Sequence, residues 1–111
     1  MSNMLAREGT RLTVHVPTEL DHHAADEIRE RVDYLLKRDT IQMLVFDFSR
    51  TTFCDSSGIG MLMGRYKMMH ALGGIVEAVH VGEPVLRILK MSGVATFMEV
   101  KSDQLCREEI R

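Results

Sequence analysis

Polar and apolar residues alternate near the start of the chain, and this alternation predicts a β-strand. The segment 11–16 carries an apolar side chain at every second position, contains β-branched residues and is ended by Pro17. Residues 4–7 are expected to pair with it in an antiparallel hairpin, through a connection of three or slightly more residues around Gly9. One face of this strand should be buried and the other face exposed to water.

A change of spacing to three and four residues predicts an amphipathic helix over residues 21–37. Its expected inward positions are Ala25, Ile28, Val32 and Leu35. Asp21 is expected to cap this helix, because a short carboxylate accepts hydrogen bonds from the unpaired amides of the first turn. Two pairs of opposite charges four residues apart should support it, namely Glu27 with Arg31 and Asp33 with Lys37.

A second helix is predicted over residues 57–72, and Gly73-Gly74 provides its expected end. Its apolar positions are Ile59, Leu62, Met63, Tyr66 and Met69. Between the two helices, residues 43–48 are mostly apolar, which is typical of a strand buried on both faces. We therefore place that strand in the centre of a sheet.

The last third of the chain continues the alternation of strands and helices. Residues 75–79 predict a strand, and a third helix is expected from Glu83-Pro84 through Lys90, because proline is favoured at the start of a helix. Residues 97–100 predict a short strand, and Ser102 is expected to cap a last helix.

Together these elements predict one α/β domain over residues 1–111, with a mixed β-sheet of four to five strands and about four α-helices. The sheet should be parallel where helices cross over and antiparallel at the first hairpin.

Composition narrows the classes of function. The chain has a formal net charge of only -2, with 27% charged residues, so it lacks the basic surface of a nucleic-acid-binding protein. No segment reaches the roughly 20 consecutive apolar residues of a membrane-spanning helix. The start lacks a basic region followed by an apolar run, so we expect a cytoplasmic protein. Cys54 and Cys106 are accordingly expected to be reduced, buried thiols.

The segment Phe53–Gly60 carries the most informative chemistry, because an acid, two hydroxyls and a glycine meet the start of a helix there. Helix amides and the helix dipole at that point would accommodate a phosphate on Ser56, although Asp55 beside it would repel the phosphate. The same residues also fit an ordinary helix cap and turn. Both interpretations remain open on the sequence pattern alone.

Catalytic and metal-binding interpretations have less support. Gly58, Gly60 and Gly64 do not match a dinucleotide-binding fingerprint, and Cys54 stands where a hydrolase nucleophile elbow around Ser56 requires glycine. The five histidines form no pair with metal-ligand spacing. We therefore expect no catalytic residue, no resident cofactor and no metal, and hence no enzyme.

Several motifs, taken in their order and spacing, resemble one known family. These motifs are Glu19-Leu20-Asp21-His22-His23, Phe53-Cys54-Asp55-Ser56-Ser57-Gly58-Ile59-Gly60, Gly64-Arg65-Tyr66-Lys67 and Met91-Ser92-Gly93. The sequence resembles the STAS-domain anti-sigma factor antagonists, in particular the sporulation stage II AA type, the anti-sigma F factor antagonists. The resemblance covers nearly the whole chain. It departs from the family at Val16-Pro17-Thr18, where a glycine is common before the Glu-Leu-Asp, and at Cys54 and Glu83-Pro84.

The resemblance implies a regulator that works by partner switching. The unmodified protein would bind an anti-sigma factor that is also a serine kinase, and a sporulation sigma factor would be released. The kinase, using ATP and magnesium, would then phosphorylate Ser56 rather than Ser57, and a serine phosphatase would reverse the modification. The implied partner-binding residues are Asp21, His22, Asp55, Ser56, Ser57 and Gly58. The protein alone is expected to be a monomer.

Two alternatives remain open. The first is a general-stress antagonist with the same fold that serves another sigma factor. The second is a STAS module that binds a nucleotide or another small ligand, for which an exposed loop at a helix N-terminus would be sufficient.

Overall fold

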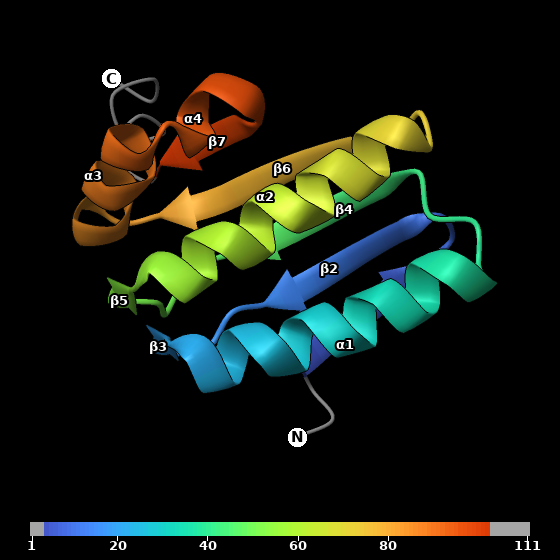
Figure 1. The fold of residues 1–111 in the computed structure, drawn as a ribbon, viewed down its shortest axis with the longest axis horizontal. Helices are drawn as coiled ribbons and strands as arrows, with labels where there is room; N and C mark the ends of the chain where they lie inside the picture. Colours follow the sequence, from blue (N-terminus) through green and yellow to red (C-terminus); the bar gives the residue numbers. More distant parts are fainter. Residues whose placement is uncertain (1–3, 103–111) are drawn as a thin grey trace.

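A five-stranded mixed sheet forms the centre of the fold in the computed structural model, which describes residues 4–102 (Figure 1). In spatial order, its strands are β1 (Leu5–Glu8), β2 (Arg11–His15), β4 (Met43–Asp47), β6 (Ile75–Val81) and β7 (Glu99–Ser102). The pair β1–β2 is antiparallel, and the other neighbours are parallel. The predicted α/β class, the mixed sheet and the antiparallel hairpin are therefore confirmed.

The central position of β4 is also confirmed. Leu44, Val45 and Phe46 are consecutive, so their side chains alternate between the two faces of the sheet, yet all three are buried. An uninterrupted apolar run was the correct sign of a strand enclosed on both sides.

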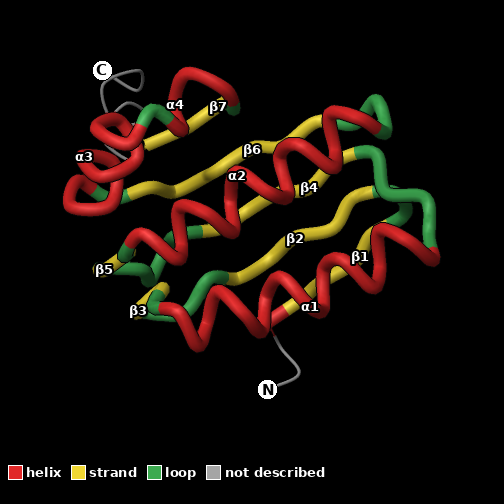
Figure 2. Tube along the Cα trace, viewed as in Figure 1, coloured by secondary structure: helices red, strands yellow, loops and turns green. Residues whose placement is uncertain are grey.

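Within residues 4–102, four helices accompany the sheet: α1 (His22–Arg38), α2 (Ser56–Ala71), α3 (Glu83–Ser92) and α4 (Val94–Phe97). Figure 2 shows α1 and α2 side by side across one face of the strands, while α3 and α4 lie near the β6–β7 edge. In the part of the chain described here, no helix is long and apolar enough to cross a membrane.

A small second sheet was not foreseen from the sequence. It consists of β3 (Glu19–Leu20) and β5 (Phe53–Cys54), which pair in parallel. Strands of two residues are too short to show a hydrophobic period, so the pattern of the sequence gave no sign of them.

The turn between β1 and β2 is shorter than the expected connection of three or more residues. It has only two residues, Gly9 and Thr10, because Glu8 pairs directly with Arg11. Gly9 has a φ of 62°, a backbone conformation that glycine adopts without steric cost.

Near the end of the described chain, Gly93 has a φ of 91° and terminates α3 in a left-handed conformation. One helical turn, α4, follows and includes Phe97, so the predicted strand begins at Glu99 rather than at Phe97. Ser102 ends β7, and the helix expected after it lies outside the described residues, as does Cys106.

The buried face of α2 is rotated relative to the prediction. Its buried residues are Gly58, Met61, Leu62, Arg65 and Met69, whereas Ile59, Met63 and Tyr66 are only partly buried. Apolar residues occur almost all around this helix, so their spacing alone could not select the inward face. On α1 the prediction was nearly correct, with Leu36 buried and Leu35 only partly buried.

A charged pair joins α1 and α2. The guanidinium Nε of Arg65 lies 2.9 Å from Oδ1 of Asp33, and Arg65 is only 7% exposed. The predicted pairing of Asp33 with Lys37 is thus replaced by a contact between helices. The N–H of this contact is poorly aimed for a hydrogen bond, and Nη1 of Arg65 is buried without one. Burial lowers the pKa of Arg65, and the nearby charge of Asp33 opposes that effect.

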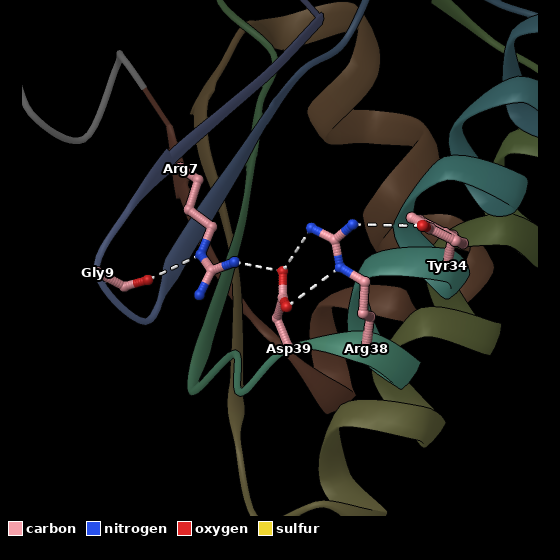
Figure 3. A network of polar contacts seen from close by, with 5 residues as sticks. All are labelled: Arg7, Gly9, Tyr34, Arg38 and Asp39. Carbon is pink, nitrogen blue, oxygen red and sulfur yellow. Dashed lines mark hydrogen bonds and ion pairs between the residues drawn. The ribbon is translucent and has the colours of Figure 1, made fainter.

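A polar network connects the hairpin to the end of α1 (Figure 3). The carboxylate of Asp39 contacts the guanidinium of Arg7 on β1 and, at 3.3 Å, that of Arg38. Arg7 also donates to the carbonyl of Gly9 at 2.9 Å, and Arg38 donates to the hydroxyl of Tyr34 at 3.3 Å. These groups are largely exposed, so the network orients the chain more than it stabilises the fold.

We expect the two members of the Arg65–Asp33 pair to respond unequally to mutation. Asp33→Asn should lower the free energy of unfolding by about 3 kcal/mol, because it leaves a buried guanidinium without its counter-ion. Arg65→Met should change that free energy by less than about 1 kcal/mol, because the new side chain is apolar and Asp33 retains contact with water. Urea unfolding of both variants measures the difference, and the reverse order would contradict this account.

Candidate functional site

The chain builds the same strand–cap–helix turn twice, and the two copies lie next to each other. Glu19 and Leu20 of β3 pair in register with Phe53 and Cys54 of β5. The amide of Asp55 donates to the carbonyl of Leu20 at 3.2 Å and extends the pairing by one step. The helices α1 and α2 therefore begin side by side at one edge of the molecule (Figure 1).

An aspartate caps each of these helices. Oδ1 of Asp21 accepts a hydrogen bond from the amide of Ala24 at 3.0 Å, and Oδ1 of Asp55 accepts one from the amide of Gly58 at 3.1 Å. The backbones of the two aspartates have nearly the same conformation, with φ values of -94° and -101°. The predicted cap at Asp21 is confirmed, and the ordinary cap interpretation of Asp55 is correct as well.

The next residues of both turns face solvent. His22 and His23 on α1 occupy the positions that Ser56 and Ser57 occupy on α2, and all four are exposed. The two histidine rings lie 4.4 Å apart between centroids. Because the first amides of a helix have no intrahelical partner, the hydroxyl of Ser56 is presented beside free N–H donors and the positive end of the helix dipole.

Gly58 differs from the other predicted site residues because it is buried. A Cβ atom at this position would lie 2.7 Å from Cγ of Leu20 and 2.9 Å from Sγ of Cys54. Gly58 therefore lies where α2 packs against the β3–β5 pair, and only a residue without a side chain lets the helix come this close to the strands. The implied contact of Gly58 with a partner stays a prediction.

Cys54 behaves as a buried apolar residue, as expected. It is 4% exposed, and burial, together with the nearby charge of Asp55, raises the pKa of its thiol to about 11. A thiol with this pKa carries almost no thiolate near neutral pH, so it has little nucleophilic character.

The electrostatic state of Asp21 follows from its cap role. The hydrogen bond from the Ala24 amide lowers the pKa of the Asp21 carboxyl, and the adjacent His23 and His22 lower it further. Asp21 is thus held as a carboxylate next to the exposed histidines.

Across residues 4–102, no three His, Cys, Asp or Glu side chains are grouped so that they could hold a metal ion.

One hollow lies away from these turns. It has a volume of about 470 Å³ and is found where α1 and α2 end, with a lining that includes Leu36, Asp39, Gln42, Leu72, Gly74 and Ile75. Ser56 lies at the other end of α2, on open surface.

Comparison with known proteins identifies the family. The sequence profile of the STAS domain matches residues 2–104. The chain belongs to the STAS-domain family. A STAS relative from Paenibacillus polymyxa, an anti-sigma F factor antagonist, is 35% identical over 94 residues, which span 85% of this chain and 80% of the relative.

Solved STAS structures share the fold. The anti-sigma factor antagonist SpoIIAA in its unphosphorylated form has a TM-score of 0.80 at 24% identity, with 96% of this chain and 94% of that chain covered. The Bacillus SpoIIAA in the phosphorylated form has a TM-score of 0.72 at 23% identity, with 96% and 97% covered. The family resemblance and the SpoIIAA-like fold predicted from the sequence are thus confirmed.

Sequence reasoning did not identify Phe53 as a surface residue. Phe53 is 47% exposed, whereas the next residue, Cys54, points into the core. The alternation along β5 produces this arrangement. Hydrophobicity alone favours a buried phenylalanine, so it could not reveal that Phe53 is exposed. The alternation along β5 could not be used either, because this strand had not been predicted.

Alanine substitutions at two glycines of α2 should have opposite effects. Gly58→Ala should lower the free energy of unfolding by about 1–3 kcal/mol, since the added methyl group meets Leu20 and Cys54. Gly60→Ala should raise it by about 0.5–1 kcal/mol, since nothing lies within 4 Å of that position and alanine favours the helix. Thermal and urea unfolding measure both changes, and equal effects would exclude the close approach at Gly58.

The lowered pKa of Asp21 predicts a dependence of stability on pH. The folded protein binds fewer protons at Asp21 than the unfolded chain does, so this contribution is complete above the unfolded pKa of about 3.9. It is lost as the pH falls through the lower folded pKa. Asp21→Asn keeps a capping oxygen and should reduce the slope of melting temperature against pH below about 4. Identical slopes for the variant and the wild type would contradict this assignment.

Proposed function

We propose that the protein is an anti-sigma factor antagonist that binds a serine-kinase anti-sigma factor, so that a sporulation sigma factor is released. Phosphorylation of Ser56 by that kinase, with ATP and magnesium, ends the interaction, and a serine phosphatase restores it. One observation carries the proposal. The hydroxyl of Ser56 is exposed at the first position of α2, in one of two adjacent aspartate-capped turns, in a chain 35% identical to an anti-sigma F factor antagonist.

A phosphate at Ser56 would change this edge mainly through its charge. It adds about -1.5 to -2 charges and three acceptor oxygens next to the carboxylate of Asp55. The free amides at the start of α2 could donate hydrogen bonds to the phosphate oxygens, so the fold should tolerate the group. A partner surface that fits a neutral hydroxyl would instead have to desolvate a dianion, which is costly without new cationic partners. The modification can therefore end binding without unfolding the domain.

The neighbouring residues have roles that are consistent with this proposal. The carboxylates of Asp21 and Asp55 are engaged by helix amides, so they are fixed in place and their remaining oxygen can face a partner. His22 and Ser57 are exposed beside Ser56 and would lie within the same contact. None of these groups is proposed to act as a catalyst.

Two findings favour the sporulation type over the general-stress type. The relative from Paenibacillus polymyxa is an anti-sigma F factor antagonist, at 35% identity. The Bacillus subtilis anti-sigma-B factor antagonist is only 23% identical over 92 residues. SpoIIAA, which shares the fold, exists in phosphorylated and unphosphorylated forms, in agreement with a serine switch.

Incubation with the anti-sigma serine kinase of the same organism and magnesium ATP should add one phosphoryl group, at Ser56. Ser56→Ala should bind the kinase but remain unmodified, and Ser56→Asp should bind roughly tenfold or more weakly because it introduces a charge. Ser57→Ala is the matched control and should still be phosphorylated. Peptide mass spectrometry and binding measurements give these results.

Three outcomes would change the proposal. Modification at Ser57 would move the acceptor by one residue. Equal affinity for the unmodified, Ala and Asp forms would refute the charge switch. If a folded, active kinase neither bound nor modified the protein, a ligand-binding STAS module would be the better account, and thermal-shift measurements with nucleotides would then test it.

A further inference from the structure

Six large hydrophobic side chains are exposed among the described residues: Tyr34, Phe53, Leu72, Ile75, Met91 and Phe97. Two of the aromatic ones have partners within the chain. The hydroxyl of Tyr34 accepts a hydrogen bond from Arg38, and the ring of Phe97 lies 5.9 Å from that of Tyr66. Phe53 makes no ring contact with any residue that the structure describes.

The strands β3 and β5 and the first residues of α1 and α2 form one edge of the molecule, which we call the Ser56 edge. We infer that Phe53 is an apolar anchor by which this edge binds the anti-sigma factor. This inference rests on the proposed function, and it adds a contact residue that the serine switch itself does not require. The partner it implies has an apolar pocket next to the kinase active site, with a cationic group at the rim of that pocket.

Distance along the chain places Phe53 inside the expected contact area. A kinase must bring its active site to within about 3.5 Å of the acceptor oxygen. A standard interface covers about 800 Å² of each partner, which corresponds to a disc with a radius of roughly 16 Å. Three residues of chain span at most about 11 Å, so a disc of this size centred on Ser56 includes Phe53.

The orientation of Phe53 supports the same conclusion. It lies on β5, and its register partner on β3 is Glu19, which is also exposed. On its other side β5 contacts α3, whose first residue is Glu83 (Figure 1). Glu83 is paired with Arg87 at 3.7 Å, so the exposed Glu19 beside Phe53 is the reason to expect a cationic group at the rim of the partner's pocket. Aromatic residues near the centre of an interface commonly provide a large share of binding energy.

Leu72 provides a matched control. It is 62% exposed, so an alanine substitution there also removes exposed apolar surface. It lies at the opposite end of α2, and a rise of about 1.5 Å per residue places it roughly 24 Å from Ser56, outside the disc.

The test measures binding of the wild type, Phe53→Ala, Phe53→Leu and Leu72→Ala to the anti-sigma F factor of the same organism, with magnesium and a nucleotide present. Phe53→Ala should bind roughly 10- to 100-fold more weakly, mainly through faster dissociation. Phe53→Leu should recover part of the loss, and Leu72→Ala should stay within about twofold of the wild type. The KM for Ser56 phosphorylation should rise in parallel with the loss of binding.

The possible outcomes separate this inference from the proposed function. If the wild type binds and is phosphorylated while Phe53→Ala binds equally well, the anchor is refuted and the function stands. If the wild type neither binds nor is modified, the proposed function itself fails. Melting temperatures of all variants control for folding. If Phe53→Ala were unfolded, Phe53→Leu and Phe53→Gln would provide the comparison, and equal affinity of those two folded variants would overturn the anchor.

Discussion

The Ser56 edge depends on the close contact of Gly58 with Leu20 and Cys54. Without a side chain at Gly58, the first turn of α2 lies directly against the β3–β5 pair, and that pair aligns the start of α2 with the start of α1. In the same turn the amide of Gly58 donates to the capping carboxylate of Asp55, and Ser56 is exposed. The same few atoms therefore contribute to the stability of the fold and to the shape of the proposed binding surface. Most substitutions in this turn will affect both.

The sequence predicted those parts of the fold in which one simple rule decided the outcome. The uninterrupted apolar run predicted β4, and the spacing around Asp21 predicted α1 together with its cap. The rules failed where the pattern was uninformative. On α2, apolar residues on nearly every side concealed which face is buried. After the left-handed Gly93, one helical turn includes Phe97 and moves the start of the predicted strand to Glu99.

Two residues lie where hydrophobicity alone would not place them. Arg65 is a cation that the fold encloses, and Phe53 is an aromatic residue that the fold leaves in water. Hydrophobicity assigns both to the wrong place. The first is explained by a counter-ion on another helix, and the second by a two-residue strand, and neither of these can be recognised from local spacing. Both capping acids, in contrast, could be named from neighbouring residues, because a short carboxylate directly precedes each helix. Ser56 was named as the candidate acceptor from the family resemblance.

The far end of α2 offers a practical consequence. The turn through Leu72 and Gly73 lies one helix length from Ser56, next to the hollow and away from both capped turns. A fluorophore or a surface tether attached at this turn would move with the rigid body of the domain and leave the Ser56 edge accessible. Rotational tumbling and surface-capture measurements could therefore follow the proposed partner binding in real time on a protein whose Ser56 edge carries no label.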